Sequence, residues 1–379
     1  MAPLWREVSI VVTRERTAVA VRLSGLAKRF VHGAKGEVTA VREVSLEVPA
    51  GSLMTLLGPS GCGKTTCLRM VAGFEAPDAG RIDIGGRDVT GLAANHRNIG
   101  FVFQNYALFP HLTVFENVAY GLRVKKVAAA EIAARVRDVL QLVGLIGYER
   151  QFPNQLSGGE QQRVALARVI VVEPAVLLFD EPLSNLDAKL RVQMRSEIQR
   201  LQRSLAITTL YVTHDQEEAM AISDRIAVMS RGELLQVGPP HELYYAPRTL
   251  FVAQFIGRAN LLPATVAAVA HDGVTVVLLG ERCRVPAPAA PPAPGARVRA
   301  MVRPEAVGLG RGADGPGLRA KVTEAVFLGE KSEYAVETPG GERLTVTTSD
   351  PELADLRPGD PVRLTLRAEL IRLFPEVAA

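Results

Sequence analysis

The chain has 379 residues, with 44 Lys and Arg against 40 Asp and Glu, so its formal net charge is only +4. This length exceeds one ordinary core and predicts about two or three domains. The near balance of charge argues against a dedicated nucleic-acid surface, and we expect no nucleic-acid partner. Three cysteines are too few for a disulfide framework, which favours a reducing compartment such as the cytosol.

The N-terminal part contains no membrane-spanning pattern, and no apolar run anywhere approaches the roughly 18 residues that a span requires. Residues 1–18 mix charges into a short apolar run and lack a small-residue cleavage pattern after it. We expect these residues to form a loose extension, which could come from a start codon assigned too early. Residues 19–26, 41–48 and 52–58 then show the composition of short strands.

The stretch "GPSGCGKTT" at 58–66 matches the phosphate-loop pattern G-x-x-x-x-G-K-[ST]. A predicted strand precedes it, and "GKTTCLRMVAG" after it predicts a helix that Gly73 closes. Lys64 supplies positive charge to the β- and γ-phosphates, and the Thr65 hydroxyl can ligate Mg²⁺. The predicted nucleotide-binding residues here are Gly58, Pro59, Ser60, Gly61, Cys62, Gly63, Lys64, Thr65 and Thr66. Cys62 serves as a small filler, and thiol reagents at Cys62 could block nucleotide binding.

Helical periodicity and short apolar runs alternate in the middle of the chain. Two helix faces are predicted, one by Ile132, Val136, Val139 and Val143, and one by Leu190, Met194, Ile198, Leu201 and Leu205. Three continuous apolar runs, at 175–179, 208–212 and 225–229, are typical of strands that are buried on both faces. This alternation predicts a parallel sheet with helices on both sides.

The stretch "AVLLFDEP" is a predicted buried strand that ends in two carboxylates. Asp180 can reach Mg²⁺, usually through water, while Glu181 is placed to activate an attacking water as general base. Acidic residues at strand ends are often merely solvated. Downstream of a phosphate loop, we interpret this pair as catalytic.

The stretch "LSGGEQQR" at 156–163 allows two interpretations. Ser157 and Glu160 match a capping box, so the stretch can simply begin a helix. A cap has no need of Gly158 and Gly159, however, and paired glycines leave backbone N–H groups open to an anion.

Five motifs in this order and spacing resemble the nucleotide-binding subunit of an ATP-binding cassette (ABC) transporter: "GPSGCGKTT", "LSGGEQQR", "AVLLFDEP", "SNLD" and "VTHD". The resemblance covers about residues 19–245. It implies an α/β fold with a P-loop ATPase core and a helical subdomain at about 105–172. ATP and Mg²⁺ are the implied cofactors. In that family the signature peptide, here Ser157, Gly158 and Gly159, covers the ATP bound by the other subunit of a head-to-tail dimer.

Further residues take their roles from the resemblance alone. Gln104 resembles the glutamine that senses Mg²⁺ and the attacking water, and the residues after it resemble a surface that docks a membrane subunit. His214 resembles the switch histidine that contacts the γ-phosphate and orients the catalytic carboxylate. Asp187 resembles the residue that links the two sites across the dimer. Phe30 stands where an aromatic stacks on adenine, although a core aromatic is the alternative.

The sequence pattern changes after about residue 246, where short β-like runs alternate with Pro and Gly turns. The proline-rich stretch at 286–295 predicts a loop or linker, and residues 246–379 predict a separate all-β unit of small barrels. The stretches at 251–266 and 302–309 resemble the oligonucleotide/oligosaccharide-binding-like (TOBE) domain of importer ATPases. The chain resembles subunits that serve polyamine, ferric iron, phosphonate or oligosaccharide uptake, and "NYALFPHLTVFENVAYGL" at 105–122 fits the polyamine and ferric iron groups best.

The resemblance therefore implies an ATPase that homodimerises around two ATP molecules and drives solute uptake through membrane permease subunits. It would work at the cytoplasmic face of the membrane, with an extracytoplasmic solute-binding protein as an indirect partner. The alternatives are a cassette ATPase acting on DNA or ribosomes and a P-loop kinase of a small molecule. The kinase leaves "LSGGEQQR" unexplained, and the balanced charge and single cassette weigh against the first. A regulatory β unit that holds the dimer open is compatible with import.

Overall fold

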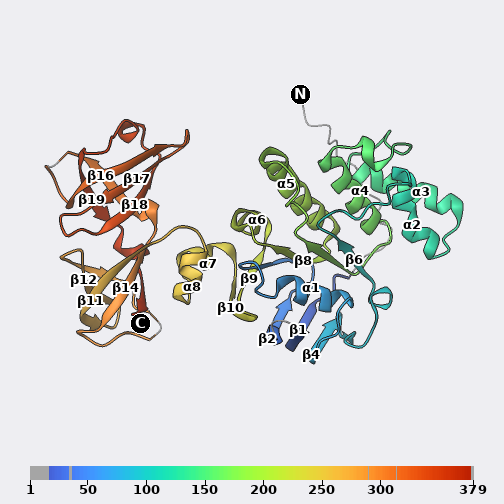
Figure 1. Cartoon of the computed structure of the whole chain (residues 1–379), viewed down its shortest axis with the longest axis horizontal. Helices are drawn as coiled ribbons and strands as arrows, with labels where there is room; N and C mark the ends of the chain where they lie inside the picture. The colour runs from blue at the N-terminus through green and yellow to red at the C-terminus, as the bar shows by residue number, and fades with distance from the viewer. Residues whose placement is uncertain (1–16, 34–35, 289, 313, 377–379) are drawn as a thin grey trace. The chain divides into compact units, whose positions relative to one another are not determined.

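The computed structural model describes residues 17–33, 36–288, 290–312 and 314–376. The chain divides into two compact units, Met1–Pro240 and His241–Ala379 (Figure 1). Nearly all of the predicted N-terminal extension lies outside the described residues. Within the described ranges, no helix is long and apolar enough to cross a membrane.

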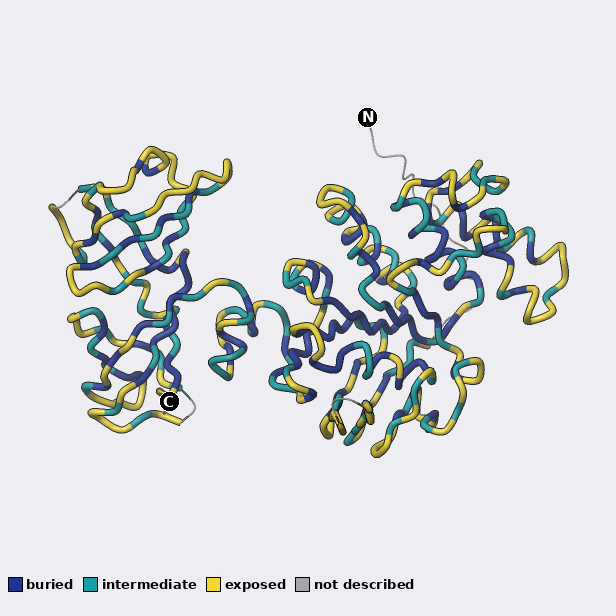
Figure 2. Tube along the Cα trace, in the orientation of Figure 1, coloured by how far each residue is buried: buried dark blue, intermediate teal, exposed yellow. Residues whose placement is uncertain are grey.

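A six-stranded sheet lies at the centre of the first unit, with the strand order β10-β9-β3-β8-β7-β6. Its strands are β3 (Leu53–Leu57), β6 (Ile99–Val102), β7 (Val176–Asp180), β8 (Thr208–Thr213), β9 (Arg225–Ser230) and β10 (Glu233–Gly238). All neighbours are parallel except β9 and β10. The three predicted apolar runs are β7, β8 and β9, and Figure 2 shows the strands of this sheet as the buried centre of the unit.

One face of this sheet is covered differently from the prediction. An antiparallel sheet of order β2-β1-β4-β5 packs there together with α1 (Lys64–Ala72), and β1, β2, β4 and α1 share one apolar core with β3, β8 and β9. Its strands are β1 (Val21–His32), β2 (Gly36–Val48), β4 (Ala79–Ile84) and β5 (Arg87–Asp88). Helices therefore cover both faces, as predicted, but the antiparallel sheet beside α1 was not predicted, because local periodicity does not reveal which sheet a strand joins.

The opposite face carries the remaining long helices, which share a second apolar core with β7 and β8. They are α2 (Val114–Val124), α3 (Ala129–Leu142), α4 (Gly158–Ile170) and α5 (Ala188–Leu205), and α6 (Gln216–Ile222) follows β8. Both predicted helix faces are confirmed. Ile132, Val136 and Val139 of α3 are buried, as are Met194 and Ile198 of α5.

The second unit contains two five-stranded antiparallel sheets, of order β13-β12-β11-β14-β20 and β15-β19-β16-β17-β18. The first sheet comprises β11 (Asn260–Ala270), β12 (Gly273–Leu278), β13 (Glu281–Val285), β14 (Arg297–Val302) and β20 (Arg372–Pro375). The second comprises β15 (Val307–Arg311), β16 (Leu318–Phe327), β17 (Ser332–Glu337), β18 (Arg343–Thr348) and β19 (Pro361–Leu366). Both sheets contribute to a single apolar core, and the proline-rich stretch forms the loop between β13 and β14.

Two short helices precede these sheets, α7 (Pro240–Tyr245) and α8 (Leu250–Phe255). The prediction of a purely β segment missed α8, because six residues are too few to show helical periodicity. Thr249 caps α8, and Ala253 packs against Met301 and Phe374. Short 3₁₀ turns occur at Ala94–His96, Pro153–Gln155, Pro304–Ala306, Pro351–Leu353 and Ala368–Leu370.

Candidate active site

The phosphate loop, residues 58–66, connects β3 to α1 at the carboxyl end of the central sheet. Lys64 is 5% exposed, and its ammonium donates to the carbonyls of Gly58 at 2.7 Å and Pro59 at 3.0 Å. Gly63 has a φ of 103°, and a Cβ there would lie 2.3 Å from the Ala40 carbonyl oxygen. Only glycine fits this position. The loop therefore curls around the Lys64 ammonium, while Pro59, Ser60 and Gly61 stay exposed.

Thr65 and Asp180 meet at the mouth of this loop. The Thr65 hydroxyl donates to Oδ1 of Asp180 at 3.1 Å. Burial raises the pKa of the Asp180 carboxyl, and the hydrogen bond from Thr65 opposes that rise. A hydroxyl and one carboxylate suit Mg²⁺, which commonly takes few protein oxygens and completes its shell with phosphate and water. The described residues contain no group of three or more His, Cys, Asp or Glu that could hold a metal ion.

Glu181 lies directly after β7, and its Oε2 is 3.1 Å from Nδ1 of His214 at the end of β8. Its backbone has a φ of 45°, in the left-handed region that side-chain-bearing residues rarely adopt. Such strain costs on the order of 1–3 kcal/mol and persists only where the surroundings impose it. Here the Glu181 N–H donates to the Val212 carbonyl at 3.0 Å. The sharp turn presents the carboxylate to His214, which is itself exposed.

Gln104 follows β6 and lies beside the turn that comes after Glu181. Its amide donates to the Ser184 hydroxyl at 3.2 Å, and the Asn185 amide donates to the Gln104 carbonyl at 2.9 Å. The Ser184 hydroxyl in turn donates to the Glu181 carbonyl at 3.0 Å. These bonds join Gln104 to the "AVLLFDEP" and "SNLD" motifs, although no separate role for Ser184 or Asn185 was predicted.

The signature peptide begins α4, and Ser157 caps that helix. The Ser157 hydroxyl accepts from the Glu160 N–H at 3.4 Å and donates to the Glu160 carboxylate at 2.7 Å. Hydrogen bonds from Ser157 lower the pKa of Glu160. The capping-box interpretation is thus correct, and the glycines also have a role within the chain. A Cβ at Gly158 would lie 3.0 Å from Leu186, and one at Gly159 would lie 2.9 Å from Leu190.

Asp187 caps α5 in the same manner, with its carboxylate accepting from the Leu190 N–H at 2.9 Å. Because Leu186 and Leu190 flank Asp187 and pack on the signature glycines, the N-terminal ends of α4 and α5 lie side by side. Both capping residues, Ser157 and Asp187, are exposed. The two motifs therefore present one common surface.

Phe30 lies on β1, where it pairs with Val38 of β2 and is half-buried. The Lys28 ammonium lies 5.4 Å from the centre of its ring. Residue 40 of β2, two positions beyond Val38, supplies the carbonyl that approaches Gly63. Stacking of Phe30 on adenine stays a prediction, and two residues of the following segment, 34 and 35, lie outside the described residues.

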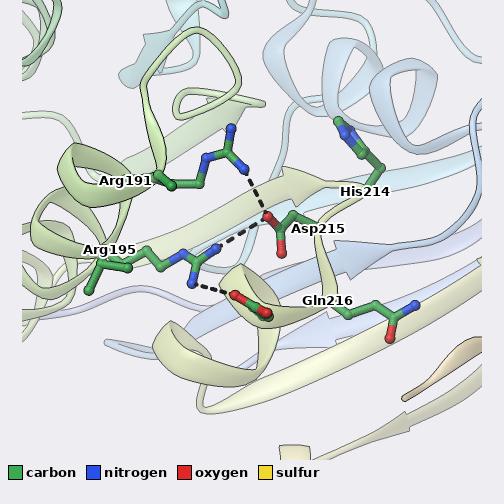
Figure 3. Close-up of a pocket in the computed structure, with 8 residues that line it drawn as sticks. Arg191, Arg195, His214, Asp215 and Gln216 are labelled. Carbon is green, nitrogen blue, oxygen red and sulfur yellow. Dashed lines mark hydrogen bonds and ion pairs between the residues drawn. The ribbon is translucent and has the colours of Figure 1, made fainter. Parts of the chain in front are cut away.

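A group of charged residues next to His214 was missed at the sequence level. Arg191 and Arg195 of α5 point toward Asp215, the residue after His214 (Figure 3). A signal was available, because two arginines four residues apart lie on one face of a helix. The sequence could not show that this face meets the end of β8.

The geometry is that of a P-loop ATPase, and comparisons with known proteins agree. A model of the ABC transporter family matches residues 41–184, and a model of the TOBE domain matches residues 300–374. The solved dimeric structure of the ATP-binding cassette MJ0796 in a post-hydrolysis state with ADP and Pi has a TM-score of 0.52 and 31% identity. It covers 58% of this chain and 98% of that one, and another dimeric MJ0796 structure has a TM-score of 0.53.

The chain belongs to the ABC transporter family. It is 49% identical over 351 residues to the spermidine/putrescine import ATP-binding protein PotA of Rubrobacter xylanophilus, a match that covers 92% of both chains. It is 48% identical over 327 residues to the Fe(3+) ions import ATP-binding protein FbpC of Brucella abortus, covering 86% of this chain and 90% of that one. The chain is an ATP-hydrolysing subunit of an ABC importer, with a cassette ATPase followed by a TOBE domain.

Proposed function

We propose that this chain hydrolyses ATP as a homodimer to drive uptake of a small cationic solute, a polyamine or ferric ion, through a membrane permease. The observation that carries the proposal is the meeting of two pairs beside the Lys64 loop: Thr65 with Asp180, and Glu181 with His214. The solute classes come from the two kinds of relative, import proteins for spermidine/putrescine and for Fe(3+) ions.

In the proposed reaction, Lys64 and the N–H groups of the phosphate loop bind the β- and γ-phosphates of ATP. Thr65, Asp180 and Gln104 would hold Mg²⁺, which supplies positive charge against the phosphates when it is bound. Glu181 accepts a proton from the attacking water, and His214 holds the Glu181 carboxylate in its orientation. Phe30 contacts the adenine ring. Lys64, Asp180, Glu181 and His214 lie far apart in sequence, but all lie at the carboxyl ends of the neighbouring parallel strands β3, β7 and β8.

The proposed dimer places the common surface of Ser157, Gly158, Gly159 and Asp187 against the ATP of the partner subunit. A helix N-terminus carries partial positive charge and open N–H groups, which suit a γ-phosphate. α4 has 13 residues, so its macrodipole is fully developed. The solved structures of a similar cassette are dimeric, which supports the proposal of a dimer. ATP then bridges the two subunits, and hydrolysis of ATP removes this bridge.

The other proposed partners are the permease subunits, reached through the residues after Gln104, and an extracytoplasmic solute-binding protein that acts indirectly. The chain would therefore work at the cytoplasmic face of the membrane. We assign residues 19–245 to the ATPase domain, about 105–172 to its helical subdomain and 246–379 to the TOBE domain.

Light scattering after size-exclusion chromatography of the Glu181→Gln protein tests the dimer. Without its general base, the protein should retain ATP and shift from monomer to dimer when Mg²⁺ and ATP are added. Lys64→Ala in the same background is the control, because loss of the phosphate-binding charge should abolish the shift. A Glu181→Gln protein that binds ATP and stays monomeric would contradict ATP-bridged dimerisation of this chain alone.

A further inference from the structure

The two carboxylate oxygens of Asp215 accept hydrogen bonds from two different helices. Oδ1 accepts from the Glu218 N–H at 3.1 Å and so caps α6. Oδ2 accepts from Nη1 of Arg191 at 3.3 Å and from Nη2 of Arg195 at 3.2 Å (Figure 3). We call Arg191, Arg195 and Asp215 the Asp215 clamp. Of these three residues, Asp215 directly follows His214 in the sequence.

The clamp is poorly arranged for stability alone. Arg195 is only 8% exposed, and the buried Nε atoms of both arginines have no hydrogen-bond partner among the described residues, although Nε of Arg191 lies 4.0 Å from the Glu218 carboxylate. Buried ions that lack full hydrogen bonding contribute little to folding, and apolar replacements often do as well. Arg195 is buried and the Arg191 side chain is 31% exposed, yet both guanidinium groups share a single carboxylate oxygen, which calls for another explanation.

The clamp connects two segments of the active site. Besides Asp215, Arg191 donates through Nη2 to the Leu186 carbonyl at 3.2 Å. Leu186 precedes Asp187 and packs on Gly158. On the other side of the clamp, Asp215 follows His214, whose ring lies 3.1 Å from the Glu181 carboxylate. One arginine thus bridges the surface proposed to meet the partner subunit and the loop that holds the catalytic histidine.

The opposite side of the His214 loop is fixed by buried groups of its own strand and helix. The Glu218 carboxylate accepts from the Thr213 hydroxyl at 2.8 Å and from the Tyr211 hydroxyl at 3.1 Å. The Thr213 hydroxyl accepts from the Asp215 N–H at 3.0 Å. Burial raises the pKa of Glu218. The loop is therefore anchored to β8 and α6, and the clamp is its hydrogen-bonded link to α5.

We propose that Arg191 and Arg195 are positioning residues for ATP hydrolysis: through Asp215 they hold His214 against Glu181 and make its position follow that of residues 184–187. Arrival of a partner subunit at Asp187 would then tighten the catalytic pair within the same chain. This inference rests on the role proposed above for His214. No change of the reaction chemistry is involved.

Asp215→Asn in the full-length protein is the decisive substitution. Asn is as good a helix cap as Asp, so its amide oxygen can keep the cap of α6, but the second position then presents an NH2 group to two guanidinium groups. We expect kcat for ATP hydrolysis by the folded variant to fall roughly tenfold, as a small misplacement of a catalytic group can cause, with KM for ATP unchanged. Glu217→Gln is the matched control, since Glu217 pairs with the same Arg195 at 3.4 Å but is 85% exposed. It should stay within about twofold of the parent, as exposed ion pairs do.

A double-mutant cycle with His214→Ala shows whether Asp215 acts through His214. Asp215→Asn should cause no further loss in the His214→Ala background, measured at high enzyme concentration. Equal losses with and without His214, or parental kcat in Asp215→Asn, would overturn the clamp while leaving the proposed function standing. Parental activity in His214→Ala would instead overturn the proposed role of His214, and the clamp with it.

Substitutions of Arg195 give an independent check. Arg195→Gln should lower kcat several-fold, and Arg195→Lys should recover most of that loss because it keeps a positive charge facing Asp215. A melting temperature close to that of the parent excludes a folding defect as the cause. Identical kcat in the Gln and Lys variants would contradict the proposal.

Discussion

The two units of this chain use buried arginine in opposite ways. In the second unit, Arg303 is fully buried and donates to the carbonyls of Tyr244, Ala253 and Arg258 at 2.7–3.2 Å. Its guanidinium also lies 4.1 Å from the centre of the Tyr244 ring. In the first unit, Arg195 contacts carboxylates and leaves its Nε unpartnered.

The difference in hydrogen bonding distinguishes a buried arginine with a structural role from one with a functional role. Backbone carbonyls accept hydrogen bonds from all three guanidinium nitrogens of Arg303, so that arginine stabilises one arrangement of α7, α8 and β14. The carboxylate partner of Arg195 belongs to a loop that also carries a catalytic residue. Completeness of hydrogen bonding indicates structure, whereas an incomplete buried network next to a reactive pair indicates function. Four predictions test the contrast.

The largest effect is expected from Glu181→Gln in the first unit. Loss of the general base should lower kcat by roughly 10²–10⁴-fold. ATP binding and the unfolding of the second unit should be unchanged, as measured by steady-state hydrolysis, nucleotide titration and chemical denaturation. Full ATPase activity in this variant would refute the assignment of Glu181.

Arg303→Met should instead affect stability alone. It leaves the carbonyls of Tyr244, Ala253 and Arg258 without their arginine donor, so we expect the free energy of unfolding of the second unit to fall by about 3 kcal/mol. Arg299→Met on the same region of β14 is the control, because its only acidic neighbour among the described residues lies at 3.9 Å and its side chain is 41% exposed. That control should cost less than about 1 kcal/mol. An Arg303→Met variant as stable as its control would contradict the structural role.

Two helix caps in the first unit allow a structural role to be distinguished from a functional one, with smaller expected effects. Thr113 and Ser157 form the same capping box, with Glu116 and Glu160. Replacing either with Ala should lower stability by about 1 kcal/mol. Only Ser157→Ala should also weaken the ATP-dependent dimer in the Glu181→Gln background. Equal dimerisation of the two variants would show that Ser157 is a cap and nothing more.

The smallest effect concerns the thiols. Burial raises the pKa of Cys62 above its ordinary value of 9.0, and Cys62 is only 3% exposed. Because the thiolate is the reactive form, alkylation should be slow near neutral pH and should accelerate as the pH rises toward and beyond 9.0. Cys283, which is half-buried, should react first, as peptide mass spectrometry can determine. Rapid ATP-protected labelling of Cys62 at neutral pH would contradict the burial of the Cys62 thiol.

Local features of both units followed from the sequence because neighbouring residues encode them. The strand, loop and helix around Lys64, the capping box at Ser157 and the buried face of α5 all rest on short spacings. The family also followed from motif order. By contrast, the mixed covering of the central sheet and helix α8 were missed, the first because pairing partners are distant and the second because six residues carry little pattern.

The amino-acid sequence alone thus indicates the reactive groups and the helices and strands that carry them. The tertiary structure decided which of these groups meet. Thr65 and Asp180 are 115 positions apart, Glu181 and His214 are 33 apart, and both contacts depend on β3, β7 and β8 being neighbours in one sheet. The left-handed turn at Glu181 and the Asp215 clamp likewise arise only when separate elements pack together. Spacing along a chain encodes local geometry, but contacts between distant segments depend on the order in which strands join.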